Sequence, residues 1–166
     1  IVLEDQGNAV CNMEDDILKV AVINRYYDTP VAVAVIKNFG LKRGALASSV
    51  AHDSHNIIVV GADDESMSKA ANAIIQERGG LSVTDGETTK ILGLPVAGLM
   101  STDSCEVVGE KYTELVKFAN EIGCTLHSPF MSLSFMALLV IPQLKLSDKG
   151  LFDGEKFEFC DLEVKD

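Results

Sequence analysis

One short segment of the chain concentrates the side chains that are best suited to proton transfer. Residues 48–56 read Ser-Ser-Val-Ala-His-Asp-Ser-His-Asn and hold two of the three histidines of the protein. An imidazole changes its charge near neutral pH, and a neighbouring carboxylate can fix its tautomer. We therefore take His52, Asp53 and His55 as candidate catalytic residues, and Ser54 and Asn56 as candidate substrate-binding residues.

The geometry of an extended chain limits what this segment can do. In a strand, His52 and Ser54 would point to one side and Asp53 and His55 to the other, so they would not converge as a Ser-His-Asp triad. The two histidines also lack the i,i+4 spacing of helical metal ligands, and no third ligand is evident, so no metal-binding residue is expected. One alternative stays open, a polar loop whose Asp and Asn side chains bond to their own backbone.

The elements that must position this segment begin with strands. Apolar runs at 45–51 and 56–61 flank it and predict two strands, so the polar residues belong to their connection. The run at 31–36 is apolar on both faces, which favours a central strand covered on both sides. The remaining expected strands are 17–23, a hairpin of 81–84 and 87–92 around Asp85-Gly86, 96–100, 138–141 and 157–164.

Two amphipathic helices and one short helix complete the expected elements. The first follows a cap at Asp63 or Asp64 and ends at Gly79-Gly80, the second follows a capping box of Asp103 and Glu106, and the third opens at Ser128-Pro129. Their apolar stripes are Met67, Ala70, Ala71, Ile74 and Ile75 in the first helix, and Val108, Tyr112, Leu115, Ala119 and Ile122 in the second.

Strands outnumber helices, and several links are too short for βαβ crossovers. The expected fold class is therefore α+β, or a mixed α/β fold, with mixed β-sheets rather than a Rossmann unit. A length of 166 residues suits a single domain over residues 1–166 with a full core.

Charge and cysteine usage exclude several classes of function. The formal net charge of −11 opposes binding to nucleic acid. The four scattered cysteines lack a C-x-x-C pair, which argues against structural zinc and a disulfide framework and favours a cytoplasmic location. The longest apolar run, 135–141, is too short to cross a membrane. The chain begins without Met and without a targeting segment, as expected for part of a longer protein.

Four blocks of sequence closely resemble the C-terminal domain of bacterial-type adenine deaminase, an amidohydrolase. They are residues 40–58, which include Ser-Ser-Val-Ala-His-Asp-Ser-His-Asn, and residues 94–101, 129–138 and 140–153. The likeness runs in order from about Asp16 to the C-terminus. It departs at Leu92-Gly93-Leu94-Pro95, where the family typically has Leu-Pro-Leu-Pro.

The resemblance implies a parent enzyme that hydrolyses adenine to hypoxanthine and ammonia in purine salvage. It also implies a divalent metal, manganese or iron, held by His and Asp/Glu on a (β/α)₈ barrel whose motifs are not in this sequence. We therefore expect no cofactor in this chain and no activity from it alone. It should pack beside its own N-terminal amidohydrolase domain, where it could cover the adenine pocket, and a homo-oligomer is compatible with this.

Two alternatives to a part in the active site remain. The chain could be a structural or oligomerisation module with no residue in the active site, or a free-standing small-molecule-binding domain, which the missing Met disfavours. A position of residues 52–55 at the mouth of a cleft favours the catalytic interpretation. A position in the interior with every polar group satisfied favours the structural module.

Overall fold

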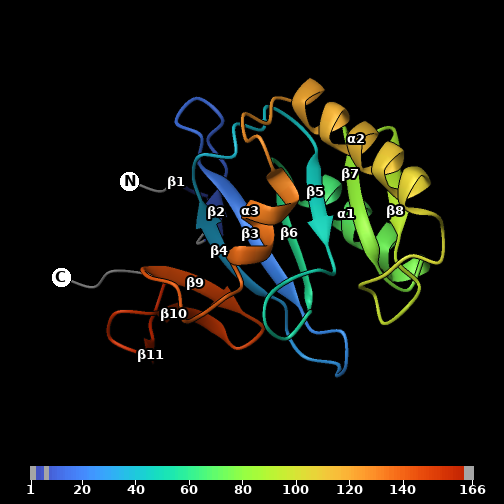
Figure 1. The fold of residues 1–166 in the computed structure, drawn as a ribbon. Coiled ribbons are helices and arrows are strands. Elements are labelled where there is room, and N and C mark those ends of the chain that lie inside the picture. The colour runs from blue at the N-terminus through green and yellow to red at the C-terminus, as the bar shows by residue number, and fades with distance from the viewer. Residues whose placement is uncertain (1–2, 6–7, 163–166) are drawn as a thin grey trace.

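The computed structural model describes residues 3–5 and 8–162, and its centre is a six-stranded antiparallel sheet (Figure 1). The strands stand in the order β4-β3-β6-β5-β7-β8. The strands form three hairpins, β3–β4, β5–β6 and β7–β8. The β3–β6 and β5–β7 pairings join these hairpins into one sheet. The bounds are β3 Leu18–Ile23, β4 Ala32–Ile36, β5 Ala45–Ser48, β6 Ile57–Gly61, β7 Gly80–Thr84 and β8 Thr89–Gly93.

Helices cover both faces of this sheet. In Figure 1, α1 (Asp64–Gln76) lies behind the sheet, and α2 (Cys105–Glu121) and α3 (Pro129–Phe135) lie in front of it. Side chains alternate across a strand, so each face has its own apolar cluster. The α1 face carries small residues of β3 and β5, Ala21, Ala45 and Ala47. The opposite face carries larger residues, including Leu18, Leu46, Ile58 and Val83, which pack with α2 and α3.

A smaller antiparallel sheet lies beside β3 and β4, at the lower left of Figure 1. It consists of β9 (Leu144–Ser147), β10 (Gly150–Asp153) and β11 (Glu158–Phe159), in the order β11-β10-β9. A separate hairpin pairs β1 (Leu3–Asp5) with β2 (Asn8–Val10). The α+β class is confirmed. The expectation of a mixed sheet is wrong, because every strand pairing among the described residues is antiparallel.

The first helix begins as predicted but differs at its end. The Asp63 side chain accepts a hydrogen bond from the Ser66 backbone N–H at 2.7 Å, which satisfies one of the free donors of the first turn. The expected stripe is buried except for Ile75, which is 53% exposed. The left-handed position at the exit belongs to Arg78, with φ 62°, one residue before the expected glycines.

The second helix uses a different cap from the expected one. Its N-cap is Ser104, whose hydroxyl accepts a hydrogen bond from the Val107 backbone N–H at 3.5 Å. Serine is a preferred N-cap, and this cap starts the helix one residue later than a cap at Asp103 would. The stripe itself is confirmed, with Leu115, Ala119 and Ile122 buried and the two earlier members partly buried. The third helix lies where it was predicted.

Three of the strand predictions fail, because an apolar run alone neither determines strand order nor excludes turns. The run at 31–36 forms an edge strand and not a central one, and Val31 and Val33 are each about half exposed. The 138–141 run is a series of turns, in which the Ile141 N–H donates to the Leu138 carbonyl. Residues 96–100 form a turn closed by one bridge between Val96 and Met100.

The last predicted strand, 157–164, is confirmed only in part. Its described portion forms the two-residue strand β11 and then leaves the sheet. Residues 163 and 164 lie outside the described residues.

Candidate functional site

The candidate residues lie on the connection between β5 and β6, as predicted. The first strand ends at Ser48, three residues earlier than expected, because serine hydroxyls replace the ladder there. The Ser48 hydroxyl accepts from the Val50 N–H at 2.9 Å. The buried Ser49 hydroxyl accepts from the Gly80 N–H at 2.8 Å and donates to the Gly98 carbonyl at 2.6 Å. These bonds fix the start of the loop on the main sheet.

The middle of this loop is a closed turn. The His55 N–H donates to the Ala51 carbonyl at 2.7 Å, and His55 has a left-handed φ of 53°. The turn brings the His52 and His55 rings together edge to face, with centroids 5.8 Å apart. In an extended strand these two side chains would point to opposite sides, and the turn instead brings their rings into contact.

The five candidate residues differ in their access to solvent. Asp53 and Ser54 are exposed, and His52 and His55 are half-buried. Asn56 is only 4% exposed, and its Oδ1 accepts a hydrogen bond from the Arg25 backbone N–H at 3.1 Å. This bond makes Asn56 an anchor of the loop, and its role toward substrate stays a prediction. The buried Nδ1 of His55 has no hydrogen-bond partner among the described residues.

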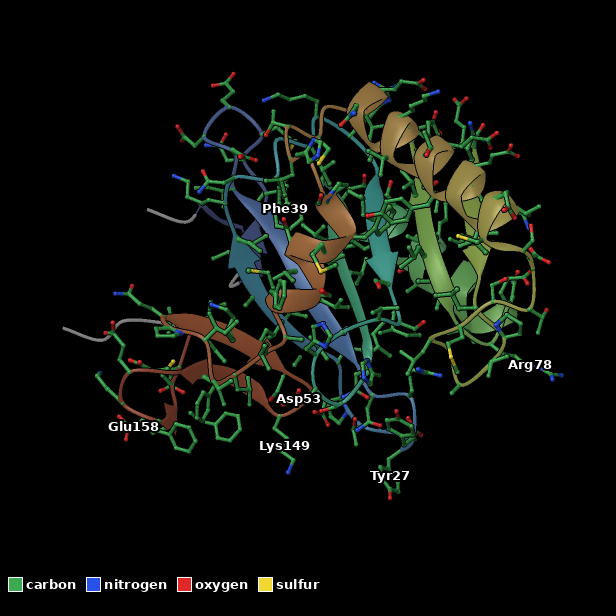
Figure 2. All side chains as sticks on the ribbon, in the orientation of Figure 1. Tyr27, Phe39, Asp53, Arg78, Lys149 and Glu158 are labelled. Carbon is green, nitrogen blue, oxygen red and sulfur yellow. The ribbon has the colours of Figure 1, made fainter. Side chains whose placement is uncertain are left out.

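Four of the candidate residues line a cleft of about 380 Å³, which is within the size range of small-molecule sites. His52, Asp53, Ser54 and Asn56 contribute one wall, and His55 lies outside the lining. Residues of the small sheet form the opposite wall. Figure 2 shows Asp53, and Lys149 of the β9–β10 turn, at the lower edge of the molecule. The other lining residues are Val22, Ala51, Ala137, Leu139, Val140, Ser147, Asp148, Phe152, Phe157 and Phe159.

Arg25 and Tyr26, from the connection between β3 and β4, brace the loop from outside. The Arg25 guanidinium donates from Nη1 to the His55 carbonyl at 3.0 Å and from Nη2 to the Ala97 carbonyl at 3.2 Å. The Tyr26 hydroxyl donates to the Ser54 carbonyl at 2.9 Å. Sequence reasoning missed both residues, because a single Arg or Tyr in a connection belongs to no motif. Backbone carbonyls of the loop thus stay fixed while the Asp53 and Ser54 side chains stay free.

The α3 helix holds the other side of the loop. The His52 N–H donates to the Ser134 carbonyl at 3.2 Å, and the His52 ring lies 5.4 Å from the Phe135 ring. The imidazole therefore rests on an aromatic surface at the edge of the cleft. In this arrangement an imidazole can donate or accept a proton, and the free carboxylate of Asp53 can accept a hydrogen bond from a bound molecule.

The opposite wall depends on a turn at Asp153. The Asp153 carboxylate accepts from the backbone N–H groups of Glu155 at 2.9 Å and Lys156 at 3.1 Å. These bonds, first that from Lys156, lower the pKa of Asp153 below its ordinary value, because they stabilise the charged form. The turn leads directly into Phe157 and Phe159 of the cleft wall.

Two features are absent from the part of the chain that the structure describes. No group of three or more His, Cys, Asp or Glu side chains is placed to hold a metal ion there. No helix in this part of the chain is both long and apolar enough to cross a membrane.

Comparison with known proteins identifies the family. A family model described as the adenine deaminase C-terminal domain matches residues 2–158. The chain belongs to this family. Curated relatives named adenine deaminase include a protein of Salinibacter ruber (54% identity over 95% of this chain and 29% of the relative), one of Methanosarcina mazei (54%, 95% and 28%) and one of a Sulfurovum strain (56%, 88% and 28%).

The adenine deaminase C-terminal domain therefore spans less than a third of the length of these relatives. The resemblance seen in the sequence is confirmed at the level of the family.

Proposed function

We propose that this domain is part of an adenine deaminase that hydrolyses adenine to hypoxanthine and ammonia, and that its 52–56 loop contacts the substrate in the intact enzyme. Relatives that bear this enzyme's name support the reaction. One observation carries the role of the loop: the Asp53 and Ser54 side chains are exposed at the cleft while the backbone behind them is fixed by Arg25 and Tyr26. Such preorganisation is what a substrate contact requires.

The proposed reaction sets specific demands on proton transfer. Water adds to C6 of adenine, the C6–N bond breaks, and the departing amino group gains a proton to leave as ammonia. An imidazole at the position of His52 can carry such a proton at neutral pH. The Asp53 carboxylate can accept a hydrogen bond from the exocyclic amine and so orient the base.

We place the source of activated water outside this chain. The family resemblance implies manganese or iron in the parent enzyme, and the described residues do not fit such a site, because they offer no group of three candidate ligands. We therefore propose that the metal and its ligands lie on the enzyme's own N-terminal amidohydrolase domain. The isolated chain should then release no ammonia from adenine. A cytoplasmic role in purine salvage is consistent with this proposal.

Kinetics of the intact enzyme test the role of the loop. Asp53→Asn and His52→Ala should each lower kcat/KM by about tenfold to a thousandfold, the range seen when a positioned hydrogen-bonding or proton-transfer group is lost. Glu110→Gln removes an exposed carboxylate on α2 and serves as the matched control. Normal kcat/KM in both loop variants would show that the loop does not contact substrate.

A second candidate function is a purely structural module. It is favoured by one observation, that the carbonyls of Ser54 and His55 and the amide of Asn56 are all bonded to Arg25 or Tyr26. In that case Asn56→Ala, which removes the bond to the Arg25 N–H, should lower the melting temperature, while kcat/KM per folded molecule stays normal in that variant and in the two loop variants above. The two functions thus predict opposite pairs of kinetic and stability results.

A further inference from the structure

Three apolar side chains stand exposed at the rim of the cleft. Phe157, Phe159 and Val140 are 71%, 52% and 63% exposed, and all three line the cleft. The two phenylalanine rings pack edge to face on the buried Phe152, at centroid distances of 5.3 Å and 5.2 Å. We call these three exposed side chains the rim surface. Grouped exposed apolar side chains of this kind mark interaction sites, whereas scattered single ones do not.

The backbone presents Phe157 outward in an uncommon conformation. Its φ is 59°, which is rare for a bulky residue, and its N–H donates to the Asp153 carbonyl at 2.8 Å. The Asp153 side chain closes the same turn through the Glu155 and Lys156 N–H groups. Unfavourable backbone positions persist where surrounding bonds enforce them, and they are frequent at functional sites. The outward position of this ring is therefore built into the turn.

We propose that the rim surface packs against the remaining part of the same polypeptide and closes the cleft over the 52–56 loop. This inference rests on the proposed function. The occupant follows from length, because the matched relatives carry more than twice this domain's length in addition to it. The rim surface surrounds the polar side chains of the 52–56 loop. Once the rest of the polypeptide covers the cleft, this apolar rim would exclude water from the loop. The open cleft of the isolated domain would then become part of an enclosed pocket.

Charge argues against a second copy of this domain as the occupant. A two-fold contact would place the rim surface against itself. It would also bring Asp53, Asp148 and Glu158, which lie in or next to the cleft wall, close to their own copies. The whole chain carries a net charge of −11, which adds to this repulsion. The partner surface should instead be apolar at its centre with basic side chains around it.

Site-directed photo-crosslinking in the intact enzyme tests this docking. A benzophenone analogue of phenylalanine replaces Phe157, and in a control protein it replaces Ile75. Ile75 is 53% exposed on α1, on the other side of the main sheet. We expect position 157 to crosslink to peptides outside residues 1–166 of the same polypeptide, and position 75 to give no such product.

Mixing enzyme labelled with light and heavy nitrogen identifies the partner. Crosslinks between light and heavy peptides would mean that a second copy covers the surface, and this would overturn the proposal. A yield from position 157 no higher than that from position 75 would overturn it as well. The crosslink and the kinetics test different proposals. A crosslink from position 157 together with normal kcat/KM of Asp53→Asn would support the docking and refute the role of the loop in binding substrate.

Discussion

Replacing Arg25 should loosen the loop that carries the candidate catalytic residues without unfolding the domain. Its side chain is half-buried and makes two charge-assisted hydrogen bonds, to the carbonyls of His55 and Ala97. A bond of this kind contributes about 1.5–3 kcal/mol when it is buried, and less where water competes. For Arg25→Ala we therefore take a total of about 2 kcal/mol. The bond from the Arg25 backbone N–H to Asn56 is independent of the side chain and should survive.

This energy sets the upper limit of the kinetic effect. Each 1.4 kcal/mol corresponds to a factor of ten, so about 2 kcal/mol lowers kcat/KM for adenine by up to about thirtyfold. Arg25→Lys keeps the charge and can make a single bond, so its loss should be smaller. Gly98→Ala should disturb the same hydrogen bonds without changing Arg25 itself, because a Cβ at Gly98 would collide with the Arg25 guanidinium. Arg43→Ala removes an exposed arginine and is the matched control.

Two measurements decide the outcome. Steady-state ammonia release by the intact enzyme gives kcat/KM, and amide hydrogen exchange reports the order of the 52–56 peptide. We expect Arg25→Ala and Gly98→Ala to raise exchange there and to lower kcat/KM together. Faster exchange at 52–56 with unchanged kcat/KM would show that the order of the loop does not matter to the reaction. Unchanged exchange would show that Arg25 does not hold the loop.

Three further predictions concern stability and reactivity. Leu46→Ala removes a fully buried side chain and should lower the free energy of unfolding by about 2–5 kcal/mol in denaturant titrations; a loss below about 1 kcal/mol would mean that the core closes around it. Burial raises the pKa of the Cys124 thiol, so Ellman's reagent should label the exposed Cys105 in the native protein and Cys124 only after unfolding; equal rates would contradict the burial. The N–H of Lys156 and that of the residue before it lower the pKa of Asp153 below 3.8. The stability that its carboxylate provides is therefore present above that value and lost as pH falls through the lower, folded pKa. The difference in unfolding free energy between wild type and Asp153→Ala should narrow from pH 7 to pH 3, and a constant difference would argue against this contribution.

The elements that could be predicted from the sequence are those marked by an apolar run, a turn dipeptide or a helix cap. The 57–61 strand is apolar throughout and is buried throughout. The β7–β8 hairpin follows from Asp85-Gly86, and α1 follows from its cap at Asp63. Neighbouring residues supply the hairpin turn and the helix cap, and the strand follows from its unbroken apolar run, so these elements could be predicted without knowledge of distant contacts.

The strands β9 and β10 of the small sheet were not predicted, and in β9 the polarity pattern is inverted. Leu144 is 51% exposed, whereas Lys145 is buried at 7% exposure with its Nζ donating to the Pro142 and Leu144 carbonyls. The more apolar 138–141 run looked like the strand and is a series of turns. Whether a strand lies at the edge or at the centre of a sheet depends on the order of the strands. The residues of the 31–36 run do not determine that order.

Only one part of the candidate site, the 52–56 loop, could be predicted from the sequence. Five polar residues between two apolar runs marked the 52–56 loop correctly as a connection. Its second wall comes from Phe157 and Phe159, about a hundred residues further along the chain, and its brace comes from Arg25 in another hairpin. Contacts between such distant segments leave no periodic pattern in either one.

The division of the main sheet into three consecutive hairpins bears on how the domain folds. Each hairpin joins neighbouring segments, so its loop-closure entropy is small and it can form within microseconds. The β3–β6 and β5–β7 pairings must then assemble these units, and α1 lies in the chain between the second hairpin and the third. During synthesis the 49–56 loop would emerge with its own hairpin, while β9–β11 emerge only after all six strands of the main sheet. One wall of the cleft would thus be ready first, and the cleft itself would form only when the small sheet docks.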